Sequence, residues 1–366
     1  MTDVALVVEG SYPYVTGGVS AWTQQLIEGL PDVSFSVVNL GDGGTARYPR
    51  PENLVEVVDL QVDHETGSVA GELPEALMYH ALATGSAGAV AATAAADRGR
   101  PFLLSEHGLA WLEARLGIVG CKPRVIDPPC IVVDAPRVEA QARRAYRDAH
   151  TVTAVCDWSA GLQRNLGARD VRVIQNAAVR PAPTALLERS SPLIGFVGRV
   201  VAVKDVVTFL DACRLVADEV PAARFVVVGP LDSDPEYAAR CTDHAEALGI
   251  DVRFTGTTDP AHWYPHLDAL VLTSRSEAQP LVALDAMAAG VPVVATAVGG
   301  CTELLAGRGL VTRPGDPPAT AAAVLRLLRD GALRARLVEA ARRRVAQEHD
   351  AAAMVAAFGS LYEAAA

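Results

Sequence analysis

The sequence of 366 residues lacks both a long apolar segment and a cysteine framework. The uncharged stretch 81–96 is mostly alanine with glycine, serine and threonine, and falls short of the roughly 20 strongly apolar residues that a spanning helix needs. The six cysteines are scattered and none forms a CxxC pair, which argues against a disulfide framework and a zinc knuckle. Asp3 stands where a signal peptide carries bases, so we expect a cytoplasmic protein without a transmembrane segment.

Basic residues are in deficit. Lys and Arg total 32 against 43 Asp and Glu, which gives a net charge of −11. Proteins that bind nucleic acid by counterion release are normally basic, so no nucleic-acid partner is expected. The arginine run 342–344 is interpreted as a solvated helix face. Peripheral contact with a membrane and the oligomeric state stay open.

Several catalytic signatures are missing as well. The sequence has neither a G-x-S-x-G elbow nor a G-x-x-x-x-G-K-[ST] loop, which removes two rival enzyme classes. His262 and His266 are four residues apart, but no glutamate stands beside His262 as in zinc proteases. We therefore predict no metal site.

The composition that is present is globular. Half of the residues are hydrophobic and a fifth are charged, and at roughly 150 residues per domain the length suggests two domains. Short apolar runs alternate with helical patterns twice over, which predicts two doubly wound α/β domains. The expected strands are 4–8, 33–39, 54–60, 102–105, 151–155 and 171–174, then 193–197, 224–228, 252–255, 269–273, 293–295 and 309–312. The expected helices include 19–30, 206–219, 235–248, 280–289 and the C-terminal region 333–365.

Prolines mark the boundary between the two halves. Pro181, Pro183 and Pro192 lie within twelve residues of one another among polar residues, which is typical of a linker. We expect an N-terminal acceptor domain over 1–182 and a C-terminal donor domain over 183–348. A last helix in 349–366 is expected to pack back on the N-terminal domain.

Chemistry is sought in the loops that follow strands, because ligands bind at the carboxyl ends of parallel strands. The first such loop ends in Gly17-Gly18 at the start of a helix, where the backbone can approach an anion. The pair does not belong to a G-x-G-x-x-G fingerprint, and an ordinary turn is the alternative.

The second loop places Arg199 and Lys204 five residues apart directly after a predicted strand. A planar guanidinium and a compact ammonium at a strand end suit a diphosphate. The alternative is a surface arginine and a lysine in a capped turn.

The third loop carries Glu277 and then Pro280, which is predicted to lie in the first helical turn. The N–H groups of Leu281 and Val282 would then be unpaired donors at the same edge. Asp285, eight residues after Glu277, is placed to bind ribose hydroxyls, with a solvated helix residue as the alternative.

Together these loops resemble the retaining glycosyltransferases of family 4, and within them the branch of the Pel exopolysaccharide glucosyltransferase. The matching stretches are EGSYPYVTGGVSAW (9–22), EHG (106–108), GFVGRVVAVKD (195–205), VGPLDSDPEYAARC (228–241) and SRSEAQPLVALDAMAAGVPVVATAVGGCTEL (274–304). The resemblance implies the GT-B fold, with two Rossmann-like domains facing a central cleft.

The resemblance also implies the reaction and its residues. A hexose would pass from a nucleotide diphosphate sugar, similar to UDP-glucose, to an unknown acceptor hydroxyl with retention, with no metal and no other cofactor. The implied catalytic residues are His107, Arg199, Lys204 and Glu277. The implied donor-binding residues are Gly17, Gly18, Gly198, Arg199, Lys204, Gly229, Thr255, Glu277, Pro280, Leu281, Val282 and Asp285. Asp285 departs from the family pattern, which has a longer glutamate there.

Two other functions stay open at this point. One is a nucleotide-sugar epimerase of the same architecture, and the other is a non-catalytic sugar-nucleotide-binding subunit of a polysaccharide assembly. The D-x-D at 232–234 is interpreted as a helix cap rather than a metal ligand, because Asp234 precedes Pro235 and Glu236.

Overall fold

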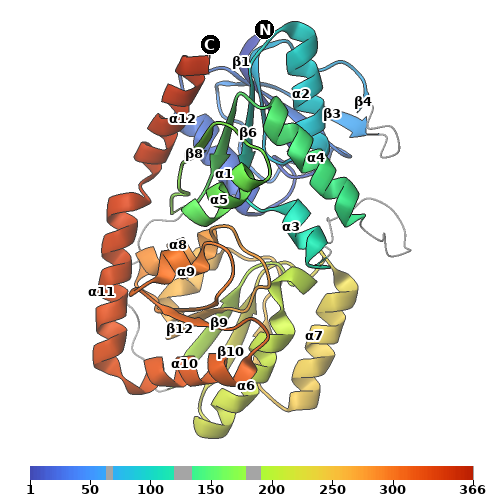
Figure 1. Cartoon of the computed structure of the whole chain (residues 1–366). Helices are drawn as coiled ribbons and strands as arrows, with labels where there is room; N and C mark the ends of the chain where they lie inside the picture. The colour runs from blue at the N-terminus through green and yellow to red at the C-terminus, as the bar shows by residue number, and fades with distance from the viewer. Residues whose placement is uncertain (63–68, 119–133, 179–190, 366) are drawn as a thin grey trace. The chain divides into compact units, whose positions relative to one another are not determined.

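A computed structural model describes residues 1–62, 69–118, 134–178 and 191–365. These residues form two compact units, each built on a mainly parallel sheet with helices (Figure 1). Unit 1 comprises 1–117, 134–178 and 351–365, and unit 2 comprises 191–350 together with Ile118. The expected boundary at 182 and all of the expected linker except its last two residues lie outside the described residues.

The sheet of unit 1 has, in the described ranges, eight strands in the order β4-β3-β2-β1-β5-β6-β7-β8. Neighbours are parallel except β3 and β4, which are antiparallel. The strands are β1 (Thr2–Glu9), β2 (Phe35–Leu40), β3 (Leu54–Val62), β4 (Val69–Ala70), β5 (Ala76–Ala81), β6 (Phe102–Glu106), β7 (Thr151–Ala154) and β8 (Val171–Val173). The six strands predicted here are confirmed within two residues at each end, whereas β4 and β5 were not predicted.

Helices lie on both faces of this sheet, and β1 shows why. Successive side chains of a strand point to opposite faces. Ala5 and Val7 pack with apolar residues of α2 and α4, whereas Val4 and Leu6 pack with those of α1 and α12. The helices of unit 1 are α1 (Gly18–Gly29), α2 (Ser86–Arg98), α3 (Ala110–Arg115), α4 (Ala135–Asp148), α5 (Asp157–Asn165) and α12 (Ala351–Ala365). A strand that is covered on both faces reads as a continuous apolar run, which is how β1 was predicted.

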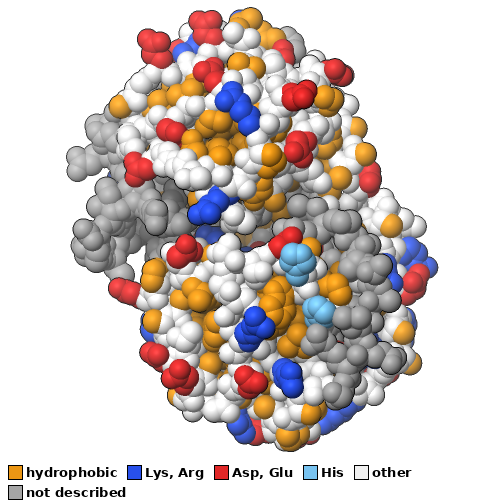
Figure 2. Space-filling view, turned by 180° about the vertical axis from the view of Figure 1, so that it is seen from behind, with side chains coloured by type: hydrophobic (Ala, Val, Ile, Leu, Met, Phe, Trp, Pro, Cys, Tyr) orange, Lys and Arg blue, Asp and Glu red, His pale blue; other side chains and the backbone are white. Residues whose placement is uncertain are grey.

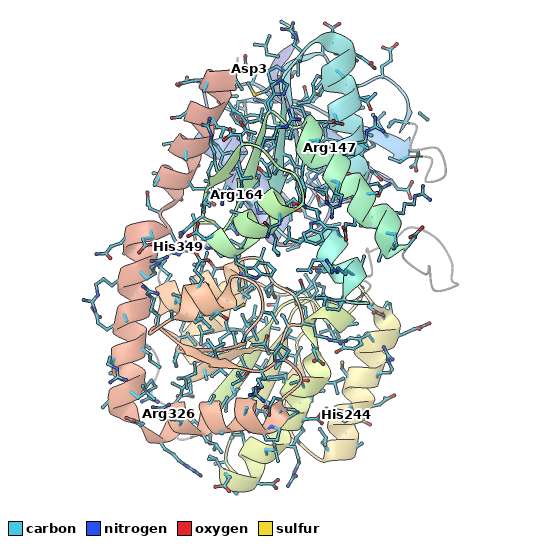
Figure 3. The ribbon with its side chains drawn as sticks, viewed as in Figure 1. Asp3, Arg147, Arg164, His244, Arg326 and His349 are labelled. Carbon is cyan, nitrogen blue, oxygen red and sulfur yellow. The ribbon has the colours of Figure 1, made fainter. Side chains whose placement is uncertain are left out.

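Two residues labelled in Figure 3 lie at the C-terminal ends of helices. Arg164 of α5 donates a hydrogen bond to the Val171 carbonyl at 3.0 Å, which ties α5 to β8. His349 ends α11 (Gly331–Glu348) and is 3% exposed. The region predicted to be helical over 333–365 therefore forms two helices, the second of which, α12, is part of unit 1.

The sheet of unit 2 has, among the described residues, six parallel strands in the order β11-β10-β9-β12-β13-β14. They are β9 (Leu193–Val197), β10 (Arg224–Val228), β11 (Val252–Phe254), β12 (Ala269–Leu272), β13 (Val293–Thr296) and β14 (Leu310–Thr312), and each was predicted to within one residue at either end. The other helices of this unit are η1 (Ala202–Lys204), α6 (Val206–Glu219), α7 (Pro235–Leu248), η2 (Pro260–His262), η3 (Tyr264–His266), α8 (Leu281–Ala289), α9 (Cys301–Leu305) and α10 (Pro317–Arg329). This strand order is that of a Rossmann fold.

The surface mixes charges of both signs. Acidic and basic side chains are interspersed over the face shown in Figure 2. Within the described part of the chain, no helix combines the length and the apolar character that crossing a membrane requires.

Candidate functional site

The loops after β9 and β12 flank the point where the strand order of unit 2 reverses. β9 pairs with β10 on one side and with β12 on the other, so the chain winds away from β9 in both directions. In such sheets ligands bind in the crevice at the carboxyl ends of the strands beside this point. The first loop carries Arg199 and Lys204, and the second carries Glu277.

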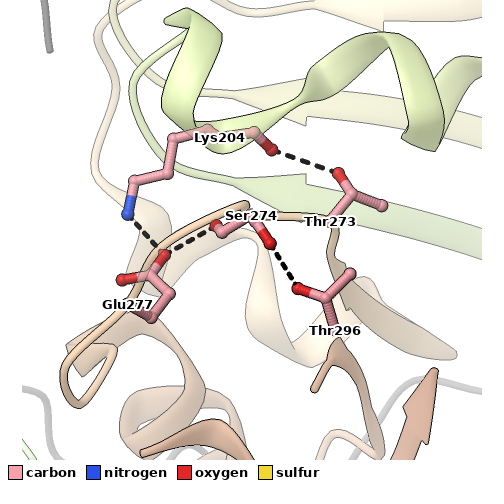
Figure 4. Close-up of polar contacts among 5 residues, drawn as sticks. All are labelled: Lys204, Thr273, Ser274, Glu277 and Thr296. Atoms are coloured by element: carbon pink, nitrogen blue, oxygen red, sulfur yellow. Dashed lines mark hydrogen bonds and ion pairs between the residues drawn. The ribbon is translucent and has the colours of Figure 1, made fainter. Parts of the chain in front are cut away.

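Lys204 and Glu277 form an ion pair at this edge (Figure 4). The Lys204 Nζ lies 2.5 Å from the Glu277 Oε1, and the Ser274 hydroxyl donates to the same oxygen at 2.7 Å. The side chains are 23% and 10% exposed, respectively. Two residues that are 73 positions apart in the sequence are therefore in contact, as expected if both loops contribute to one ligand site.

Backbone contacts hold these two loops against each other. The Thr273 hydroxyl donates to the carbonyls of Lys204 and Asp205, at 3.2 and 2.8 Å. The Arg275 N–H donates to the Val203 carbonyl at 2.8 Å. Asp205 has φ of 49°, an uncommon left-handed conformation for a residue other than glycine. The position of Lys204 is therefore fixed by its neighbours before any ligand arrives.

Gly198 and Gly229 lie where the backbones of two loops approach each other closely. Gly229 has φ of +146°, and a Cβ there would lie 2.1 Å from the Gly198 carbonyl oxygen. The Gly198 N–H donates to the Val228 carbonyl at 2.9 Å, which holds the loops after β9 and β10 together. Glycine is thus required at 229 by the fold, whatever it contributes to a ligand.

Arg199 differs from Lys204 in its surroundings. Its side chain is partly exposed and has no hydrogen bond or ion pair to any residue that the structure describes. A guanidinium at the carboxyl end of β9 without an internal partner is available to an anion.

The start of α8 supplies backbone donors at the same edge. The helix begins at Leu281, so Pro280 is its N-cap and not, as predicted, a residue of the first turn. Proline fits this N-cap, because the φ of Pro280 is −71°, close to the value at which the pyrrolidine ring locks it. The N–H groups of Leu281 and Val282 have no hydrogen-bond acceptor within the described ranges. A helix N-terminus with such groups favours anions.

Asp285 and Thr255 occupy less open positions. Asp285 lies on α8 and is 7% exposed, so the alternative of a solvated helix residue is wrong. α8 is buried because it packs in the interior of unit 2 with apolar residues on most sides. Thr255 follows β11 directly, and its hydroxyl donates to the Gly256 carbonyl at 3.0 Å.

The interpretation of Asp234 as a cap is confirmed. Its carboxylate accepts from the Tyr237 N–H at 3.1 Å, and α7 begins at Pro235. In the described residues, no three His, Cys, Asp or Glu side chains gather as metal ligands would. Metal independence stays a prediction.

His107 lies in unit 1, directly after β6. Its ring packs against the indole of Trp22 of α1, with the centroids 4.4 Å apart and the ring planes tilted by 58°. Burial lowers the pKa of His107 to about 4, although a hydrogen bond with the Asn176 side chain opposes the shift. The imidazole is therefore neutral near pH 7, and its buried Nε2 has no hydrogen-bond partner among the described residues.

Gly17 and Gly18 lie at the start of α1, which also carries Trp22. Gly17 is the N-cap, with an extended φ of 178°, and a Cβ there would meet nothing within 4 Å. The fold of unit 1 therefore does not demand glycine at 17, in contrast to 229. Space beside a helix N-terminus is what an approaching anion needs.

Glu106, the last residue of β6, was not predicted as a site residue. It is 1% exposed, and its carboxylate accepts hydrogen bonds from Thr84, Tyr146 and Gln163. Burial raises the pKa of Glu106 to about 7 despite these three donors. The only sequence signal was its place beside His107 in EHG, because its partners are far away in the chain.

Comparison with known proteins now identifies the family. The model described as "Glycosyl transferases group 1" matches 191–330, and a domain of unknown function, DUF3492, matches 2–68 and 64–170. A D-inositol 3-phosphate glycosyltransferase of Salinispora arenicola is 30% identical over 354 residues, which cover 90% of this chain and 77% of that protein. The chain belongs to the group 1 glycosyltransferases.

Other relatives of this glycosyltransferase match over shorter ranges. A D-inositol 3-phosphate glycosyltransferase of Frankia alni is 32% identical over 278 residues, which cover 69% of the chain and 66% of the relative. Three more proteins of that name are matched over only 45%, 36% and 44% of their length.

Solved structures show the fold of this glycosyltransferase to be GT-B. Sucrose-phosphate synthase of Thermosynechococcus elongatus superposes with a TM-score of 0.79 at 20% identity, over 100% of this chain and 99% of that chain. Anabaena Alr3699/HepE, solved in complex with UDP-glucose, gives a TM-score of 0.74 at 17% identity over 99% of both chains. The expected architecture of two Rossmann-like domains is therefore confirmed.

Proposed function

We propose that this protein transfers a hexose from a nucleotide diphosphate sugar to an acceptor hydroxyl, with retention of the anomeric configuration and without a metal ion. The observation that carries the proposal is the Lys204–Glu277 pair at the reversal point of the unit 2 sheet, where a Rossmann fold binds its ligand.

The leaving diphosphate is the group that most needs stabilisation. As the bond between C1 and the phosphate oxygen breaks, negative charge grows on the diphosphate. Lys204 and Arg199 provide two positive charges, and the N–H groups of Leu281 and Val282 provide a helix N-terminus. These donors are fixed in advance, so they stabilise the developing charge without reorganisation.

The sugar is the second group to be held. We assign Glu277 to the sugar hydroxyls, because one of its oxygens is committed to Lys204 and Ser274 while the other is left for a ligand. We assign His107, which is neutral, to the region of the anomeric carbon. The acceptor oxygen then attacks C1 on the face that the diphosphate leaves, and its proton passes to the departing phosphate oxygen.

Relatives suggest the donor and the pathway. HepE is solved with UDP-glucose, which supports UDP-glucose or a close relative as the donor here. The Vi polysaccharide biosynthesis protein VipC/TviE of Salmonella typhi is 36% identical over 113 residues, 30% of this chain and 19% of that protein. Together with the sequence resemblance, it supports an acceptor on the way to a polysaccharide, in the branch of the Pel glucosyltransferase.

The experiment is incubation with a panel of nucleotide sugars and saccharide acceptors, followed by NMR of the product. The expected result is release of the nucleoside diphosphate only with an acceptor present, and a product with the anomeric configuration of the donor. An inverted product contradicts retention. Epimer formation from donor alone supports the epimerase, and donor binding without turnover supports the non-catalytic subunit.

A further inference from the structure

Tyr146 of α4 joins two residues that bracket His107 in the sequence. Its hydroxyl donates to the Glu106 Oε2 and accepts from the Trp111 Nε1 at 3.0 Å. Glu106 is the last residue of β6, and Trp111 lies in the first turn of α3. One oxygen atom therefore holds both ends of the segment 106–111.

Both anchors are buried, which makes the arrangement rigid. Tyr146, Glu106 and Trp111 are 0%, 1% and 2% exposed. Water does not compete for these hydrogen bonds, and a donor or acceptor left unpaired there would lose its solvation without replacement.

The Glu106 carboxylate is in turn held from two further elements. Thr84 lies in the loop after β5, and its hydroxyl donates a hydrogen bond to the Glu106 Oε1 at 3.0 Å. The Gln163 amide of α5 donates to its Oε2 at 3.1 Å. A buried carboxylate that accepts hydrogen bonds from three neutral donors is costly to keep in its charged form. A buried ionisable group is therefore weak evidence for a role in stability, and its geometry has to be considered for a role in positioning.

We propose that Tyr146 is a positioning residue that sets the loop bearing His107 through hydrogen bonds to both ends of that loop. The inference rests on the proposed function, in which His107 touches the transferred sugar. Tyr146 itself belongs to the apolar core of unit 1, so it acts only through the loop.

The test compares two tyrosine-to-phenylalanine variants that lose the same atom. Tyr146→Phe removes the bridging hydroxyl. The matched control is Tyr79→Phe, because Tyr79 is also 0% exposed and its hydroxyl donates to the Pro74 carbonyl at 2.8 Å. We expect kcat of Tyr146→Phe to fall about tenfold, since small misplacements at a reacting centre are costly. Its KM for the donor should stay within about twofold, because the proposed diphosphate site is in unit 2.

A double-mutant cycle shows whether the effect passes through His107. In a His107→Ala background, Tyr146→Phe should lower kcat no further, since coupled residues are not additive. A full additional loss in that background overturns the inference, and so does a kcat of Tyr146→Phe equal to that of Tyr79→Phe. If Tyr146→Phe does not fold, Glu106→Gln takes its place in the same cycle, with the same two outcomes.

The failure of the proposed function has a different signature. If wild-type protein transfers no sugar, or if His107→Ala alone leaves kcat unchanged, the role of His107 is wrong. If wild-type protein is active and His107→Ala is impaired, but Tyr146→Phe behaves as the control, only the positioning role is wrong.

Discussion

Lys204 and Arg199 share a loop but differ in what their removal leaves behind. Lys204 neutralises the Glu277 carboxylate, which is 10% exposed, so a Lys204→Ala chain keeps a nearly buried charge without its cation. Breaking such a pair from one side is destabilising. Arg199 has no internal partner among the described residues, so its loss exposes no such charge.

We therefore predict a contrast between two alanine variants. Arg199→Ala should lower kcat about a hundredfold, equivalent to about 3 kcal/mol, with an unchanged melting temperature. Lys204→Ala should lower kcat similarly and also reduce the melting temperature. Steady-state kinetics and melting curves test this, with Arg329→Ala as a control because its ion pair with Glu219 is exposed. Near-normal kcat in Arg199→Ala would contradict the diphosphate site.

The glycines of the proposed site should also separate stability from activity. Gly229→Ala places a Cβ against the Gly198 carbonyl and should destabilise unit 2 by about 1–3 kcal/mol. In Gly17→Ala the added Cβ lies in open space and φ stays in the extended region, so the stability of the protein should change little. If an anion approaches the backbone at Gly17, the same Cβ should lower the rate of sugar transfer. Urea unfolding together with turnover measures both. A stable Gly229→Ala, or a fully active Gly17→Ala, would show the corresponding interpretation to be wrong.

The location of a site residue could be predicted from the sequence where the end of the preceding strand could be predicted. Arg199, Lys204 and Glu277 lie in the loops that follow apolar runs, so their place at the ligand edge could be predicted from the sequence. Their roles toward a ligand stay predictions. The burial of Asp285 and the network around Glu106 could not be read, because both depend on packing between segments that are distant in the chain.

At the level of elements, β5 shows where the pattern fails. Its sequence ALMYHA combines good helix formers with a histidine, and strand propensity gave no signal. The strand exists because β1 and β6 pair with it on either side and helices cover it. His80 fits this interior because its ring nitrogens bond with Tyr362 and Ser105, at 2.8 and 2.7 Å.

His80 also makes the free energy of unfolding of unit 1 depend on pH. Burial lowers the pKa of His80 to about 3, so below about pH 6.5 the unfolded chain takes up a proton that the folded chain refuses. Stability should then fall as pH falls from 6.5 toward 3, by about 1.4 kcal/mol per pH unit for this group. His107 adds to this slope, whereas Glu106, with its raised pKa, opposes it between about pH 4.5 and 7.

The prediction is that His80→Gln has a smaller loss of stability than wild type on going from about pH 6.5 to about pH 5. Urea unfolding at both pH values gives the difference for each protein. The absolute stability of the variant does not matter to this comparison, since only the change with pH is used. Equal pH slopes in the two proteins would rule out His80 as a source of the acid sensitivity.

For the whole molecule we predict that turnover survives EDTA. Two cations and a helix N-terminus are assigned to the diphosphate, and Asp234 of the D-x-D is engaged as a helix cap. Initial rates after dialysis against EDTA, with and without added Mn²⁺ or Mg²⁺, measure the effect. Loss of activity that a metal restores would overturn the proposed charge balance.

Because α12 belongs to unit 1, the N-terminal unit cannot complete its core until the end of unit 2 has been synthesised. Unit 1 needs Phe358 and Tyr362 to cover one face of its sheet, yet 160 residues of unit 2, 191–350, are made before them. At roughly 5–20 residues synthesised per second, that face of the sheet stays uncovered for on the order of ten seconds or more before α12 is made. Unit 2, although second in the sequence, is therefore complete first. A chaperone that shields apolar surface during synthesis should engage the nascent N-terminal half and leave only after α12 has been made.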